Sequence, residues 1–175
     1  QRLPVVVVNP SAPIGPGDVK PTPTGRLVLQ AANGQVPAYV DTGLNVVHVD
    51  DVAEGHFLAL ENGKEGEKYI LGGENLSLLE ILTMIAEVSG RRPPSLQLPH
   101  NLILPIAYIA EVWAKYISGK EPFANVDSVK MSKKPMYYSS EKAIMELGYR
   151  PRPVKEAFID SIKWFDEHGY IEIIK

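Results

Sequence analysis

The stretch that decides the fold is VVVVNPSAPIGPGD, residues Val5–Asp18. Its four consecutive β-branched residues, Val5–Val8, predict a short strand buried on both faces, as in a parallel sheet. The strand runs into prolines and glycines, which remove backbone donors and permit positive φ angles, so the chain must leave the sheet as a shaped loop. Ligands of open α/β sheets bind just beyond the carboxyl ends of the strands, which makes this loop a candidate site edge. An ordinary buried strand followed by a rigid turn has the same pattern.

Composition bounds the class of protein. The chain has 175 residues, enough for one domain with a sizeable core, and its 45% hydrophobic and 22% charged residues are typical of a soluble globular protein. A net charge of −3 without an extended basic face argues against a nucleic-acid partner. The absence of cysteine excludes disulfides, a thiolate metal site and a cysteine nucleophile, and it fits a cytoplasmic location. The most apolar stretch, Leu102–Ile117, is too short to span a membrane and contains Glu111 and Lys115.

Short strands alternate with helices along the rest of the chain, which predicts the α/β class. We expect Val36–Val40 and Asn45–Val49 to form a small hairpin, and Lys68–Leu71 to pair in parallel through a right-handed crossover with the strand before it. Ser95–Leu98 is a further short strand. Capping residues and glycine stops predict helices from Thr22 or Thr24 to Ala32, from Asp51 to Asn62, from Ser77 to just before Gly90, from Leu102 to Ile117, from Ser140 to Leu147, and from Pro153 to just before Gly169.

Two of these helices carry sharper expectations. Ser77 and Glu80 have the spacing of a capping box, and Asp51 and Glu54 have the same spacing with aspartate in place of serine. The helix that follows Asp51 is expected to bury one side, made of Val52, Ala53, Phe57 and Leu60.

Few residues point to chemistry by themselves. The four histidines, His48, His56, His100 and His168, fit no zinc spacing, so no metal site is expected. Ser11, His48 and Asp50 could in principle form a hydrolytic triad, but no Gly-x-Ser-x-Gly sequence surrounds any serine. We therefore expect His48 to pack along its strand, while Asp50 or Asp51 caps the next helix. The lysines Lys130, Lys133 and Lys134 fit either an anion site or a solvated face.

Taken together, an ordered set of segments resembles the C-terminal portion of an extended short-chain dehydrogenase/reductase of the NAD-dependent epimerase/dehydratase superfamily. The segments are VVVVNPSAPIGPG (5–17), VHVDDVA (47–53), YILGG (69–73), SSEKA (139–143) and ELGYRP (146–151). Within that superfamily the chain is similar to the hopanoid-associated sugar epimerases, also called dihydroflavonol 4-reductase-like. This closer likeness lies in KPTPTG (20–25), PAYVDTGLN (37–45) and WFDEHGY (164–170).

The resemblance implies an α/β fold made of the last parallel strands of a Rossmann-type sheet and a small substrate-binding domain. Residues 4–18 would form a strand and loop of the nucleotide-binding sheet, and residues 50–73 a returning helix and the last sheet strand. Residues 19–49 and 74–175 would form the substrate-binding segments. An apolar face on Leu102–Tyr108 could cover an apolar substrate or touch a membrane surface, although a core or subunit-contact helix explains the same residues.

The resemblance also supplies residue roles. It implies NAD or NADP as the cofactor, with Asn9, Pro10 and Ser11 against the nicotinamide end. The positions implied on the substrate side of the cleft are Thr22, Ala38, Val40, Asn45, Lys133 and Lys134. No catalytic residue is expected here, because the glycine-rich cofactor turn and the catalytic Tyr-x-x-x-Lys of such enzymes belong upstream of Val5.

The implied function is that of the substrate-binding half of an NAD(P)-dependent sugar epimerase or reductase acting by hydride transfer, incomplete without its N-terminal half. The alternatives are a dihydroflavonol-type carbonyl reductase and a non-catalytic binding or regulatory relative. Asn45 stands near where nucleotide-sugar epimerases commonly have a phosphate-binding arginine, which weakens the case for a nucleotide-linked sugar. The expected partners are a small sugar or carbonyl compound, the upstream half and a second copy of the chain, because unpaired strand edges invite association.

Overall fold

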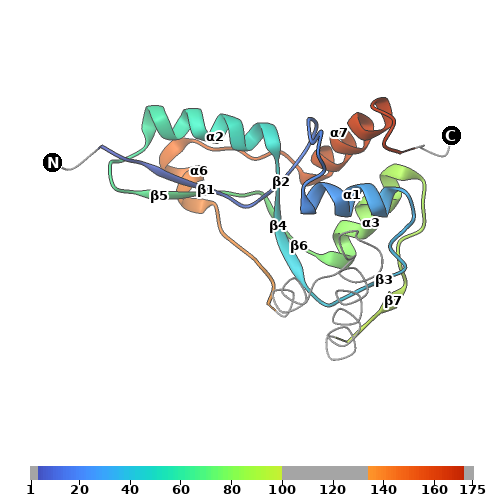
Figure 1. Ribbon diagram of the computed structural model, residues 1–175. Coiled ribbons are helices and arrows are strands. Elements are labelled where there is room, and N and C mark those ends of the chain that lie inside the picture. Colours follow the sequence, from blue (N-terminus) through green and yellow to red (C-terminus); the bar gives the residue numbers. More distant parts are fainter. Residues whose placement is uncertain (1–3, 100–133, 172–175) are drawn as a thin grey trace, which may run out of the picture.

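The computed structural model describes residues 4–99 and 134–171 and confirms the α/β class (Figure 1). In chain order its elements are β1 (Val7–Pro10), β2 (Ala12–Ile14), α1 (Pro23–Ala32), β3 (Ala38–Tyr39), β4 (Gly43–His48), α2 (Val49–Asn62), β5 (Lys68–Leu71), β6 (Glu74–Ser77), α3 (Leu78–Ser89), β7 (Leu96–Gln97), α6 (Glu141–Leu147) and α7 (Val154–Glu167). The predicted helix Leu102–Ile117 and the lysines Lys130 and Lys133 lie outside the described residues. None of the helices within 4–99 and 134–171 is long and apolar enough to cross a membrane.

The strands form three small sheets. β1 pairs in parallel with β5, and β3 pairs in parallel with β7. In the third sheet, β4 lies between β2, to which it is parallel, and β6, to which it is antiparallel. A single residue, Ser11, connects β1 to β2, so the chain passes from one sheet to another at this point.

Strand β4 divides two hydrophobic clusters, because successive residues of a strand point to opposite faces. Val46 belongs to the cluster between α1, α3, α7 and the sheet β2-β4-β6, whose fully buried members include Phe158 and Phe165. Val47 belongs to the cluster that α2, α6 and β5 enclose, together with Tyr69 and Leu71. Figure 1 shows the two groups of helices on either side of β4. The Ser11 connection therefore lies between two separately packed halves.

Local sequence signals placed several helices correctly. Thr22 is the N-cap of α1, where its Oγ1 accepts the Gly25 N–H at 3.2 Å, and Pro23 occupies the first turn. Ser77 and Glu80 form the predicted capping box of α3, and Gly90 ends that helix with a left-handed φ of 69°. Helix α7 lies within its predicted bounds and buries one face, which includes Val154, Phe158, Ile162 and Phe165.

The first strand differs from its prediction. It begins at Val7 rather than Val5 and continues through Pro10, and it is not buried on both faces, because Val5 and Val7 are 48% and 37% exposed. Val6 and Val8 pack against the cluster of α2, α6 and β5, which covers one face of the β1-β5 sheet. Among the described residues only β5 pairs with β1, so one face and one edge of this strand stay open.

The predicted pairings around β4 were also wrong. β3 does not form a hairpin with β4, and β5 finds its parallel partner in β1 rather than in β4. The reason is that other segments already pair with β4 along both edges, because β6 occupies one edge and β2 together with Met136 occupies the other.

Helix α2 begins two residues earlier than predicted, and of its predicted buried side only Val52 is buried. His48 is the N-cap, so Asp51 lies inside the first turn and makes no capping box. Phe57 and Leu60 are 69% and 82% exposed, whereas Gly55 faces β5. A Cβ on Gly55 would lie 2.8 Å from the methyl carbons of Leu71, so a small residue here lets the helix approach the strand closely. The face with small residues, Gly55 and Ala59, packs inward, and the face with Phe57 and Leu60 is exposed.

Ser140 occupies the predicted start of α6 but makes no side-chain capping bond there. Its Oγ instead accepts the N–H of Gly72 at 2.9 Å and thereby fastens the end of β5 to α6.

Candidate functional site

A cavity of about 550 Å³ lies where the β1–β2 connection meets the first half of β4. Residues 9–13 form one wall of this cavity. The rest of its lining is given by Thr24, Leu44, Asn45, Ile70, Met136 and Tyr138. Asn9 and Pro10 stand at the carboxyl end of β1 beside its parallel partner β5, which is the position where ligands of parallel α/β sheets bind. The cavity therefore includes the three predicted cofactor residues, Asn9, Pro10 and Ser11.

Ser11 is fixed through its backbone but not through its side chain. Its N–H donates to the carbonyl of Leu71 at 3.1 Å, which holds the turn against β5. Its Oγ is buried and has no hydrogen-bond partner within residues 4–99 and 134–171. A buried hydroxyl without a partner is costly, so this turn fits a site that a polar ligand group completes.

Asn45, predicted on the substrate side, is only 2% exposed and its amide is engaged inside the protein. The Oδ1 atom accepts the Gly73 N–H at 3.0 Å, and Nδ2 donates to Asn75 Oδ1 at 2.7 Å. The same Nδ2 lies 3.3 Å from the carbonyl oxygens of Gly73 and Tyr138. Asn45 thus links β4 to the β5–β6 turn and to the segment before α6.

A second cavity of about 430 Å³ lies between residues 13–18 and the start of α1. Thr22, another predicted substrate residue, contributes to its lining. The N–H and Oγ1 of Thr22 both donate to the carboxylate of Asp18, at 2.9 to 3.0 Å. Thr24 and Pro13 border both cavities, so Thr22 and Asn45 belong to adjacent cavities.

The other predicted substrate residues are placed apart from these two cavities. Ala38 lies in β3 and Val40 just after it, and neither lines either cavity. Lys134 is exposed and likewise lines neither. Lys133 lies outside the described residues. The structure thus brings four predicted residues, Asn9, Pro10, Ser11 and Asn45, to one cavity.

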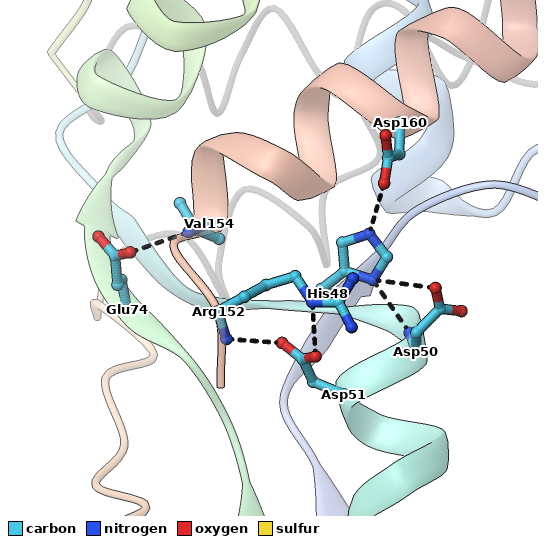
Figure 2. A network of polar contacts seen from close by, with 7 residues as sticks. All are labelled: His48, Asp50, Asp51, Glu74, Arg152, Val154 and Asp160. Atoms are coloured by element: carbon cyan, nitrogen blue, oxygen red, sulfur yellow. Dashed lines mark hydrogen bonds and ion pairs between the residues drawn. The ribbon is translucent and has the colours of Figure 1, made fainter. Parts of the chain in front are cut away.

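His48 is buried at the junction of β4 and α2 and serves the fold rather than a hydrolytic triad (Figure 2). Its Nδ1 accepts the Asp50 N–H at 3.1 Å, which assigns the ring proton to Nε2, 3.2 Å from Asp160 Oδ2. His48 itself caps α2, so the expectation that Asp50 or Asp51 would do so was wrong. Among the described residues no group of acidic, histidine or cysteine side chains could hold a metal ion.

Figure 2 also shows two carboxylates whose partners local sequence patterns did not reveal. The carboxylate of Asp51 is 3% exposed. It accepts one hydrogen bond from the backbone N–H of Arg152 at 2.9 Å and another from the side-chain Nε–H of Arg152 at 2.7 Å. Desolvation lowers the pKa of Arg152, but the hydrogen bond and charge of Asp51, with the charges of Asp50 and Glu156, raise that pKa overall. Glu74 accepts the Val154 N–H at 2.9 Å and so caps α7. The first pair is 101 positions apart and the second 80, so no motif spacing could have indicated them.

Comparison with known proteins gives a consistent family. The signature of the NAD dependent epimerase/dehydratase family matches residues 1–72. A Synechocystis protein named "Putative dihydroflavonol 4-reductase" is 45% identical over 96% of this chain and 50% of its own length. "Sterol demethylase protein B" of Methylococcus capsulatus is 32% identical over 97% of this chain and 52% of its own length. The chain thus spans about half the length of the curated relatives it matches.

Two solved structures show the same arrangement. The crystal structure of gox2253 has 52% identity and a TM-score of 0.79, over 95% of this chain and 50% of that one. PA4631, a nucleoside-diphosphate-sugar epimerase from Pseudomonas aeruginosa, has 28% identity and a TM-score of 0.78, over 97% of this chain and 50% of that one. The matched signature contains the turn at Asn9–Ser11 that borders the larger cavity. By sequence and fold, the chain is similar to proteins of the NAD-dependent epimerase/dehydratase family over about half of their length.

Proposed function

We propose that this chain is the C-terminal, substrate-binding half of an NAD(P)-dependent epimerase or reductase that acts by hydride transfer. The observation that carries the proposal is the position of Asn9–Ser11. This turn follows a strand with a parallel partner, borders the cavity of about 550 Å³, and falls within the part of the chain that the family signature matches.

The open side of β1 supports the assignment of one part of the chain to the cofactor-binding sheet and the rest to substrate binding, as the resemblance implies. Residues 4–18 and 50–73 would complete a larger parallel sheet, while residues 19–49 and 74–175 would hold the substrate. Val5 and Val7 are apolar yet exposed, and one edge of β1 has no partner strand in the described part of the chain. An upstream parallel strand would cover both features. We place the whole enzyme in the cytoplasm, as the sequence suggested.

The proposed cofactor residues are Asn9, Pro10 and Ser11. Bound NAD(P) would supply and accept the hydride, which no side chain can do. Asn9 is exposed at the strand end and offers an amide donor and acceptor, while Pro10 leaves the backbone there without a donor. The partnerless Ser11 hydroxyl adds a third polar group for the nicotinamide end.

The substrate would bind in the same cavity, against the lining residues that follow the turn in the chain. Leu44 and Met136 contribute apolar surface to the cavity, and Tyr138 adds polar atoms. We keep Thr22, Ala38, Val40, Asn45, Lys133 and Lys134 as the proposed substrate-side positions. The proposed substrate class is a small sugar or other carbonyl compound.

The test begins with the parent reading frame. We expect it to encode a glycine-rich turn and a Tyr-x-x-x-Lys upstream of Val5, and we expect the full-length protein to bind NADH or NADPH. Turnover should vanish when the upstream tyrosine is changed to phenylalanine, because it would serve as the acid/base. A parent frame without that tyrosine and lysine would leave a non-catalytic binding or regulatory relative as the better description.

A dihydroflavonol-type carbonyl reductase is the second candidate. It is favoured by the name of the 45% identical relative and by Asn45 at the position where an arginine would suit a nucleotide phosphate. Reduction consumes NADPH in proportion to product, whereas epimerisation inverts a centre with no net cofactor consumption. Assaying a dihydroflavonol and a nucleoside-diphosphate sugar side by side separates the two.

A further inference from the structure

Two asparagine amides hold one wall of the larger cavity in place. Asn45 comes from β4 and Asn75 from β6, and both contact the backbone of Tyr138. Tyr138 and the nearby Met136 line the same cavity as the Asn9–Ser11 turn.

The Asn75 side chain pairs with Tyr138 as one strand pairs with the next. Its Oδ1 accepts the Tyr138 N–H at 3.1 Å, and its Nδ2 donates to the Tyr138 carbonyl at 3.1 Å. Asn45 braces this pair, since its Nδ2 donates to Asn75 Oδ1 at 2.7 Å. Two residues before Tyr138, the backbone of Met136 bonds to β4. The Met136 N–H donates to the Gly43 carbonyl and the Met136 carbonyl accepts the Asn45 N–H, both at 2.9 Å. Residues 136–138 are thus attached to β4 and β6 by backbone and side-chain bonds together.

The Asn45 amide has little capacity left for a ligand. Its Oδ1 accepts from Gly73, and its two Nδ2 hydrogens face three acceptors within the protein. The residue is also 2% exposed. An amide that is buried and fully hydrogen-bonded within the protein affects a ligand by positioning the groups bonded to it, not by contacting the ligand itself.

We propose that Asn45 and Asn75 are positioning residues that place Tyr138 at the cavity wall and thereby set the affinity for the substrate without touching it. This inference rests on the proposed function, because it assigns the cavity to that function's substrate. Displacing a substrate-facing wall by about 1 Å can change turnover up to about a hundredfold, so the loss of two amide bonds is sufficient to be measured.

The test uses the full-length parent protein with three variants. Asn75→Ala removes both hydrogen bonds between Asn75 and the Tyr138 backbone, which we call the clamp, and leaves only the 3.3 Å contact from Asn45 Nδ2 to the Tyr138 carbonyl. Asn75→Asp keeps the oxygens that accept from Tyr138 and Asn45, and it should restore part of the effect. Ser77→Ala is the matched control on the same strand, because it removes the cap of α3 and leaves the cavity lining intact.

Two readouts separate positioning from general stability. Amide hydrogen exchange in the peptide that contains Tyr138 should be about tenfold faster in Asn75→Ala and unchanged in Ser77→Ala. The KM for a dihydroflavonol or a nucleoside-diphosphate sugar should rise about tenfold in Asn75→Ala, while the KM for the nicotinamide cofactor changes less than about twofold.

The exchange rates test whether the clamp exists, and the substrate KM tests whether the clamp affects substrate affinity. Unchanged exchange in Asn75→Ala overturns the clamp, and faster exchange with an unchanged substrate KM overturns its role in substrate affinity. An equal rise of substrate KM in Ser77→Ala would show that only stability matters. A wild-type parent that turns over neither probe overturns the proposed function and the substrate role together, while the exchange rates still decide whether the clamp exists.

Discussion

At the scale of single residues, almost every buried polar side chain of the described chain has found a partner, and the exceptions are informative. Asn45, His48 and Asp51 are each bonded to residues from other elements. Ser11 Oγ and Tyr149 Oη are buried without a hydrogen bond in the described residues. Ser11 borders the candidate site, whereas Tyr149 lies in the cluster of α2, α6 and β5.

We expect Tyr149→Phe to leave the protein as stable or to stabilise it by about 1 kcal/mol, because it removes a desolvated hydroxyl without a partner. Burial, followed by the nearby Asp51 and Glu54 charges, raises the pKa of Tyr149 far above its usual value, in keeping with an uncharged and unpaired phenol. Urea denaturation of the two proteins measures the difference. A loss of stability beyond about 1 kcal/mol would reveal a hydrogen bond to this hydroxyl.

Glu146 should give the protein part of its acid sensitivity. A hydrogen bond from the Tyr69 hydroxyl, at 2.9 Å, and then one from Lys64 lower the pKa of Glu146 below its ordinary 4.5. A carboxylate whose pKa is lower in the folded state stabilises the protein above pH 4.5, and this contribution is lost as the pH falls through the folded-state value. Glu146→Gln should therefore lower the melting temperature at pH 7, and the gap to wild type should close below pH 4.5. Melting curves across this range check it, and a gap that does not narrow as the pH falls below 4.5 would contradict it.

At the scale of elements, buried ion pairs matter more than exposed ones. The Asp51–Arg152 pair joins the first turn of α2 to the segment before α7, with Asp51 almost fully buried. The Lys155–Glu87 pair joins α7 to α3, but both side chains are more than half exposed.

Arg152→Ala should cost roughly 2 kcal/mol of unfolding free energy, since it leaves the buried Asp51 carboxylate with the Arg152 backbone N–H alone. The loss stays below that of a fully buried pair because the Arg152 side chain is 33% exposed. Lys155→Ala is the control, and its exposed ion pair should contribute no more than about 0.5 kcal/mol. Guanidinium denaturation of both variants compares them, and equal losses would show that burial of Asp51 is unimportant.

At the scale of the whole molecule, the open side of β1 governs association. One edge of β1 and one edge of β5 lack a partner strand among the described residues, and Val5 and Val7 expose apolar surface beside them. Such an edge is a template for pairing with another chain. The exposed Phe57 and Leu60 of α2 add further apolar surface to the same half of the molecule.

We expect this chain, expressed without an upstream half, to form dimers or larger assemblies. Val7→Lys should shift it toward monomer, because a charged side chain on an edge strand opposes pairing. Val19→Lys is the control, since Val19 is 70% exposed but lies in the loop before α1. Light scattering over a wide concentration range measures the mass of each, and a wild-type chain that stays monomeric throughout would refute the expectation.

Much of the local structure could be predicted because its causes are local. Thr22, Ser77, Gly90 and Gly148 act within one turn of the helix that they cap or end, so short windows of sequence contain all the necessary atoms. The family resemblance likewise led to Asn9–Ser11, and these residues do border a cavity. Their proposed roles stay predictions, as do those of Thr22, Ala38, Val40, Lys133 and Lys134.

What the sequence determined by itself is the α/β class, most boundaries of the described helices and the family resemblance, because these depend on neighbouring residues and on ordered motifs. The tertiary structure alone decided which strands pair, which face of α2 is buried, and that Asn45 and Asp51 bind inside the protein. These outcomes depend on partners far apart in the chain, such as Gly55 with Leu71 and Asp51 with Arg152. Packing and hydrogen bonding between distant segments leave no spacing for a sequence pattern to record.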